Sequence, residues 1–206
     1  MATRVITWRA DAASGEQRFE QVRVDDDLGA LRARGTILVG SGELVAADGD
    51  QPGPYRVDYE LDTEPTLATH RLLVRAEGAG WRRELWLRRD GERGWTCRRV
   101  TDPDVHTPAL ADVGALTGAL DCDLVSSALF NLMPIRRSGL HRTGGTQDFL
   151  MAWVSIPDLT VTPSHQRYGH VRPGVVSFGS EGGFTAEVEV DEDGYVTRYP
   201  SVAARV

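Results

Sequence analysis

The chain has 206 residues, of which 41% are hydrophobic and 26% charged, a balance that suits a folded domain with one sizeable core. Its net charge of −7 provides no basic excess for a phosphate backbone, so we expect no nucleic-acid partner. All 23 of its basic residues are arginine, which excludes catalysis through a lysine Schiff base and the lysine of a P-loop.

The N-terminal residues show no signal-peptide pattern, and no run approaches the ~20 apolar residues of a membrane helix. We therefore expect a cytoplasmic protein without membrane insertion. Cys97 and Cys122 are isolated in the sequence, and in a reducing compartment we expect both thiols to stay unbridged.

The first half of the chain reads as antiparallel strands. Apolar residues occupy the odd positions of 55–61 and charged residues the even ones, as in a strand with one wet face. Asp90-Gly91 separates 81–89 from 94–100 and predicts a hairpin. Asp48-Gly49 predicts a further turn, and 102–108 is expected to be a connection.

The segment 118–137 interrupts this pattern with opposite charges on either side of an apolar run. If 120–124 is a strand, Asp121 and Asp123 point to one face and Cys122 to the other. Three roles remain open for the two acids. They can pair with arginines, contact a ligand such as a sugar hydroxyl, or act as the acid and base of a hydrolase.

A short helix is expected to start at Ser126, its N-cap, and to end at Met133 because Pro134 follows. Arg136 and Arg137 come next, and adjacent side chains usually point in different directions. A buried guanidinium needs a carboxylate or an anionic ligand. We therefore expect one arginine to pair with an aspartate and the other to face ligand or solvent.

The last part of the chain returns to strands. The run 149–156 is apolar on both faces, 184–190 alternates, and Asp193-Gly194 predicts a hairpin before 195–199. We expect roughly ten to thirteen strands in all. The predicted fold is mainly β: one strongly curved antiparallel sheet or partly open β-barrel with one or two short helices, in a single domain over 1–206.

Aromatic side chains combine an apolar face with a polar edge, which suits sugar rings and lipid tails. Of those along the chain, we expect Trp81, Trp153 and Tyr168 to line a cavity. The histidines and cysteines show no metal-ligand spacing, so we expect neither a metal ion nor a cofactor.

Two central motifs stand out, Asp121-Cys-Asp-Leu124 and Phe130-Asn-Leu-Met-Pro-Ile-Arg-Arg137, together with 156–159, 166–168, 184–191, 193–196 and 199–200, the strand 55–61 and Trp81. In these residues the sequence resembles a known family, the glycolipid-binding family of bacterial proteins, formerly a domain of unknown function. Two features depart from the family pattern. Ser127, Ala128 and Leu129 stand where threonines are usual, and Ser138 follows the arginine pair where leucine is common.

The resemblance implies a fold similar to the half-barrels of bacterial lipoprotein carriers. It also implies a small amphipathic ligand, such as a glycolipid or another lipid, in the concave face of the sheet. An acyl chain in such a groove would contribute about 0.8 kcal/mol for each buried methylene. The acids Asp121 and Asp123, the amide Asn131 and the cations Arg136 and Arg137 would then organise the headgroup contacts.

We favour a binding protein without catalytic activity and keep two alternatives. One is a hydrolase of a glycoside or ester that uses Asp121 and Asp123, which requires both carboxyls to reach one open cleft. The other is a structural or interaction module whose curved sheet is filled by its own side chains.

Overall fold

The computed structural model describes residues 2–27, 29–41, 53–91, 94–101 and 112–206. Its strands are β1 (Ala2–Ala10), β2 (Gln17–Asp27), β3 (Ala30–Ser41), β4 (Tyr55–Thr63), β5 (Thr69–Gly78), β6 (Trp81–Asp90), β7 (Gly94–Thr101), β8 (Asp121–Leu124), β9 (Thr146–Val154), β10 (Val161–Arg172), β11 (Val175–Ser180), β12 (Thr185–Val190), β13 (Val196–Tyr199) and β14 (Ala203–Arg205). One α-helix, α1 (Leu132–Ser138), and 3₁₀ turns at Ala12–Ser14, Val113–Leu116 and Leu129–Asn131 complete the described elements. The predicted turn at Asp48-Gly49 and the connection 102–108 lie outside the described residues.

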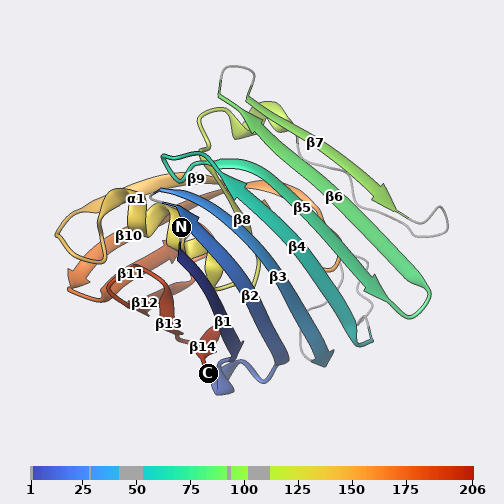
Figure 1. Ribbon diagram of the computed structural model, residues 1–206, viewed down its shortest axis with the longest axis horizontal. Helices are drawn as coiled ribbons and strands as arrows, with labels where there is room; N and C mark the ends of the chain where they lie inside the picture. The colour runs from blue at the N-terminus through green and yellow to red at the C-terminus, as the bar shows by residue number, and fades with distance from the viewer. Residues whose placement is uncertain (1, 28, 42–52, 92–93, 102–111) are drawn as a thin grey trace.

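The fourteen described strands form one strongly curved, open sheet in the order β7-β6-β5-β4-β3-β2-β1-β14-β13-β12-β11-β10-β9-β8 (Figure 1). The mainly β, curved-sheet prediction is confirmed, with one more strand than the upper end of the expected range. Most neighbours are antiparallel, but β8 pairs with β9 in parallel. A parallel pair needs a crossover, and here the chain between β8 and β9 supplies it through the 3₁₀ turn and α1.

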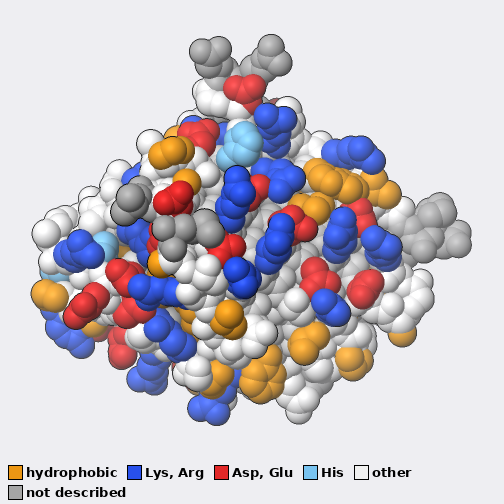
Figure 2. All heavy atoms as spheres, in the orientation of Figure 1, with side chains coloured by type: hydrophobic (Ala, Val, Ile, Leu, Met, Phe, Trp, Pro, Cys, Tyr) orange, Lys and Arg blue, Asp and Glu red, His pale blue; other side chains and the backbone are white. Residues whose placement is uncertain are grey.

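Alternation along the strands separates a core face from an outer face. In β4, Tyr55, Val57, Tyr59 and Leu61 are buried, as the sequence pattern predicted. The outer face carries interspersed arginine and acidic side chains (Figure 2), with ion pairs such as Arg71–Asp62. The sheet therefore packs its core on the concave side.

Both predicted hairpins are present. Asp90-Gly91 lies at the turn between β6 and β7, whose strands pair antiparallel from Asp90 and Gly94 onward. Asp193-Gly194 joins β12 to β13, and Gly194 has φ +85°, a conformation that glycine adopts at little cost. These local signals located the turns correctly because turn chemistry acts over a few residues only.

The predicted helix was wrong in its bounds. Ser126 does not cap it: that residue lies in the turn after β8 with φ +65°. The helical segment starts at the 3₁₀ turn Leu129–Asn131 and continues through Pro134 to Ser138, ending at Gly139 with φ +68°. Pro134 is tolerated because it occupies the first turn of α1, where its missing N–H would have no helical acceptor.

The expectation that one of the two adjacent arginines faces ligand or solvent was also wrong. Arg136 forms an ion pair with Asp26 at the end of β2 (2.6 Å), and Arg137 forms a two-pronged ion pair with Asp121 on β8. The two side chains diverge because α1 includes them in its last turn. The helix therefore lies inside the curve of the sheet, tied to strands distant in sequence (Figure 1).

Both cysteines are free thiols, Cys122 buried and Cys97 partly so. Burial raises the pKa of Cys97 to about 11, despite the lowering influence of Arg99.

In the described ranges, no helix has the length and apolar character needed to cross a bilayer.

Candidate functional site

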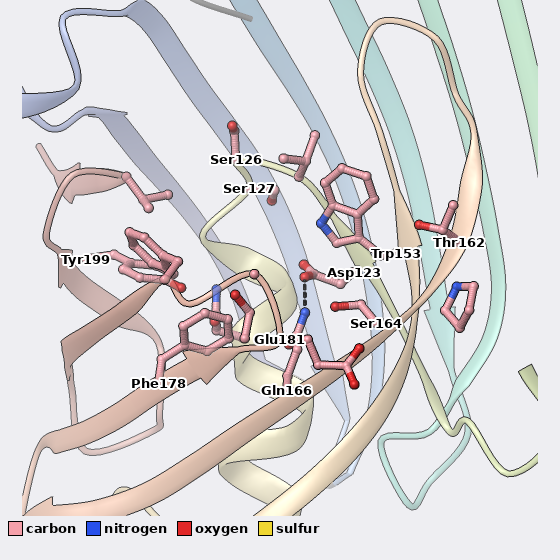
Figure 3. Close-up of a pocket in the computed structure, with 17 residues that line it drawn as sticks. Asp123, Ser126, Ser127, Trp153, Thr162, Ser164, Gln166, Phe178, Glu181 and Tyr199 are labelled. Carbon is pink, nitrogen blue, oxygen red and sulfur yellow. Dashed lines mark hydrogen bonds between the residues drawn. The ribbon is translucent and has the colours of Figure 1, made fainter. Parts of the chain in front are cut away.

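A pocket of about 510 Å³ opens on the concave side of the sheet, within the range of ~300–1,000 Å³ common to small-molecule sites. It lies between β8–β11 and the segments that follow β8 and β13 (Figure 3). Its described lining comprises Asp123, Val125, Ser126, Ser127, Asn131, Trp153, Thr162, Pro163, Ser164, Gln166, Phe178, Ser180, Glu181, Gly182, Phe184, Tyr199 and Val202.

Strand register brings the polar wall of the pocket together. Asp123 on β8 pairs with Trp153 on β9, which in turn pairs with Thr162 on β10. Further along β10, Gln166 pairs with Ser180 of β11. Because side chains alternate along a strand, alternate residues of four neighbouring strands point into one pocket.

The buried floor is a hydrogen-bonded set of side chains. The Gln166 amide donates to Asp123 Oδ2 (2.7 Å), and the Tyr168 hydroxyl lies 3.1 Å from Gln166 Oε1 and 3.0 Å from Asn131 Oδ1. Gln166 and Asn131 are only 3% and 5% exposed. These contacts hold both amides in place, so the floor presents oriented donors and acceptors.

Asp123 is the acidic group of this floor and is partly exposed to the pocket. Among the described residues, no arginine forms an ion pair with it. Burial raises the pKa of Asp123 to about 6, the nearby charge of Asp121 adds to the increase, and the bond from Gln166 opposes it. The carboxyl therefore changes charge close to neutral pH.

Replacing Asp123 with asparagine is expected to stabilise the protein at pH 7.5 by about 1 kcal/mol. The pKa of Asp123 is raised in the folded state, so the wild-type protein loses stability as pH increases from about 4 to about 6. The loss persists at higher pH. Asparagine carries no charge and can still accept from Gln166. Thermal unfolding should show that the Asp123→Asn variant is more stable than the wild type at pH 7.5 but not at pH 4. An equal gain in stability at both pH values would contradict the prediction.

A buried carboxylate holds the back wall, and we call this group the Glu20 anchor. Glu20 on β2 accepts hydrogen bonds from the Tyr59 hydroxyl (2.6 Å), the Ser127 hydroxyl and the Ala128 N–H (2.9 Å). Burial raises the pKa of Glu20, and the three donors oppose that increase. The anchor thus fixes the pocket-lining loop at Ser127 to a strand more than a hundred residues away.

Arg18, on the same face of β2, holds the same wall. Its guanidinium donates to the backbone carbonyls of Ser126 and Val202 (2.7 Å to the latter) and pairs with Glu16 (2.9 Å). The Arg18 side chain is 2% exposed and bound to three acceptors, so it stabilises the wall behind the pocket.

The opposite wall is aromatic. Phe178, Phe184 and Tyr199 form a three-ring cluster with centroid separations of 5.7–6.1 Å. Trp153 lies across the pocket from Tyr199 and Phe178 (Figure 3). No described residue hydrogen-bonds the Tyr199 hydroxyl. Aromatic rings therefore line two sides of the pocket, and polar groups line its floor.

The structure brings some of the predicted site residues together and separates the others. Asp123, Asn131 and Trp153 line the pocket, and Tyr168 supports its floor. Asp121 is 1% exposed and paired with Arg137, and Arg136 pairs elsewhere. Trp81 lines a different hollow, beside Tyr55 and Gly78. Because Asp121 does not reach the pocket, the two acids do not share one cleft.

Sequence reasoning missed Gln166, Ser127, Glu20 and the ring cluster. A signal was present for one of them. Glu20 shares a strand face with Val22 and Val24, so it is a polar residue in an apolar register. Gln166 shares its face with Thr162 and Ser164, so the sequence gives no sign of its burial. The ring cluster gave no such signal, since its members come from β11, the β11–β12 turn and β13.

In the described part of the chain, no three metal-ligating side chains lie close enough to hold an ion. The pocket instead offers hydroxyls, amides, carboxylates and aromatic rings. Such groups can hydrogen-bond and stack on an organic ligand.

Fold and pocket together place the chain among half-open β-barrel proteins, a class whose concave face offers a ligand cavity. A family model described as "Putative glycolipid-binding" matches residues 5–205, so the chain belongs to that family. The resemblance noted at Asp121–Leu124 and Phe130–Arg137 is confirmed.

Among solved structures, the chain is similar to a DUF1089 family protein from Pseudomonas aeruginosa. The TM-score is 0.68 and the sequence identity 22%, over 91% of this chain and 92% of that chain. At this identity the likeness shows a shared fold. No curated protein matches the sequence.

Proposed function

We propose that the protein binds, without catalysing a reaction, a small amphipathic molecule whose headgroup is an uncharged polyhydroxylated ring, as in a neutral glycolipid. The observation that carries this proposal is the pocket of about 510 Å³, with its hydrogen-bonded amide floor beneath two aromatic walls. Sugar hydroxyls need paired donors and acceptors, and the apolar faces of sugar rings stack on aromatic side chains. The family description agrees with such a ligand.

The charge of the lining supports an uncharged headgroup. Asp123 and Glu181 are its two acids, and none of the described lining residues is an arginine. Arg18 lies behind the wall with its guanidinium already bound to carbonyls and Glu16. A phosphorylated or sulfated headgroup would meet two carboxylates without a facing cation, which costs binding free energy.

Replacing Trp153 with alanine is expected to weaken binding of octyl β-glucoside at least tenfold, about 1.4 kcal/mol, since one stacking wall is lost. The matched control is Trp86→Ala, because Trp86 is a partly exposed tryptophan outside the pocket, stacked under Arg98. Isothermal titration below the critical micelle concentration measures both. Mass spectrometry of organic extracts of the purified protein should also detect a bound lipid.

Equal affinity of the two variants for the glucoside would place binding elsewhere on the protein. Octyl phosphate serves as the anionic comparison. If it bound as well as the glucoside, the assignment of an uncharged headgroup would be wrong.

A further inference from the structure

The most buried polar side chains of the pocket and its most exposed aromatic ring lie at different depths. The buried polar lining consists of Ser127, Asn131 and Gln166, each at most 5% exposed. At the opening, Phe184 is 40% exposed and lies beside the exposed Glu181 and Gly182. The pocket is therefore polar at its floor and carries an exposed aromatic ring at its rim.

The floor is backed by side chains that are themselves buried and bonded. Tyr168 lies behind Gln166 and Asn131 with 2% exposure, and Glu20 accepts from Ser127. Behind Glu20, Tyr59 packs against Phe130 at 5.4 Å between ring centroids. If the apolar chain entered first, it would displace water from the remaining donors and acceptors of this polar floor without replacing those hydrogen bonds, which is costly.

The aromatic wall gives an apolar chain a path in the other direction. Phe178 is buried beside Tyr168 at 5.1 Å, Tyr199 packs on Phe178, and Phe184 continues the cluster to the surface. Rings thus run without interruption from the polar floor to the rim.

Resting on the proposed function, we propose that the ligand binds head-inward: the polar headgroup occupies the floor at Gln166 and Asn131, and the apolar chain leaves along Phe178, Tyr199 and Phe184. The chain is covered only as far as the rim. The expectation from the sequence was an acyl chain in the groove with Asn131 among the headgroup contacts, and it gave no orientation of the ligand along the groove.

The test compares methyl, hexyl, octyl and decyl β-glucosides by isothermal titration below their critical micelle concentrations. Head-inward binding predicts that methyl glucoside binds measurably and that the gain of about fourfold per methylene stops once the chain passes Phe184. A fourfold gain that continues through decyl, with no binding of methyl glucoside, would overturn the orientation.

Two variants locate the ends of the ligand. Phe184→Ala should weaken octyl glucoside at least fourfold, because only the end of its chain reaches this ring, and should leave methyl glucoside unchanged. Gln166→Leu should weaken both ligands at least tenfold, with its fold checked by circular dichroism. Phe19→Ala is the control, because Phe19 is an exposed phenylalanine on the outer face of β2.

The outcomes separate the two proposals. If Phe184→Ala weakens methyl and octyl glucoside equally, the orientation is overturned while binding in the pocket stands. If none of the glucosides binds and organic extracts of the protein contain no lipid, the proposed function itself fails.

Discussion

Replacing Glu20 with alanine is expected to lower the free energy of unfolding by about 4 kcal/mol, because the change leaves three buried donors without an acceptor. The Tyr59 hydroxyl, the Ser127 hydroxyl and the Ala128 N–H all donate to this one carboxylate. Water cannot replace it easily, since Glu20 is fully buried. Urea unfolding measures the difference, provided that the free energy of unfolding depends on urea concentration with the same slope in both proteins.

The matched control is Glu20→Gln, which keeps an acceptor and nearly the same volume. Burial raises the pKa of Glu20, so the wild type loses stability as pH increases above about 4.5, and glutamine should remove that pH dependence. If alanine and glutamine variants unfolded at the same urea concentration, the Glu20 anchor would not stabilise the fold.

The anchor also depends on a close approach between strands. The Tyr59 ring crosses β3 at Gly35, where an added Cβ would clash with the ring. Glycine at this position therefore lets Tyr59 reach Glu20 on the next strand. The loss of pocket structure in Glu20→Ala should accordingly weaken glucoside binding as well as stability.

Replacing Arg137 with leucine is expected to cost about 3–5 kcal/mol of stability at pH 7, since it leaves the carboxylate of Asp121 buried without its cation. Nη1 of Arg137 donates to Asp121 Oδ1 at 2.8 Å, and a second nitrogen donates to the other oxygen. Burial raises the pKa of Asp121 even with Arg137 present, and removal of the cation raises it further. Guanidinium unfolding at several pH values measures the effect.

The sign of the pH dependence is distinctive. With a folded-state pKa raised further above the unfolded value, the variant loses more stability than the wild type as pH increases from acid to neutral. Adding Asp121→Leu to Arg137→Leu should recover much of the loss. The control Arg167→Leu breaks an exposed pair with Asp148 and should change little. A loss that was independent of pH would contradict the ion-pair explanation.

Local patterns in the sequence predicted much of the fold. The alternation at Tyr55–Leu61 identified a strand and its buried face, and Asp193-Gly194 identified a hairpin. The spacing of Asp121 and Asp123 correctly placed both on one strand face. These predictions hold because pleating and turn chemistry depend on the backbone within a few residues.

The same reasoning failed where a residue's role depends on distant partners. Asp121 and Asp123 have equivalent local surroundings, yet one pairs with Arg137 and the other faces the pocket beside Gln166. The position of α1 inside the curve decides this difference. Trp81 on β6 and Trp153 on β9 likewise line different hollows of the curved sheet.

The sequence by itself determined which residues share a strand face, because a β-strand alternates its side chains whatever surrounds it. On β2 that rule groups Arg18 and Glu20 with Val22 and Val24, and all four are buried. Only the tertiary structure decided what the two charged members contact. Their partners on β4, after β8 and after β13 are brought within reach by the order and curvature of the fourteen described strands, which no local stretch of chain encodes.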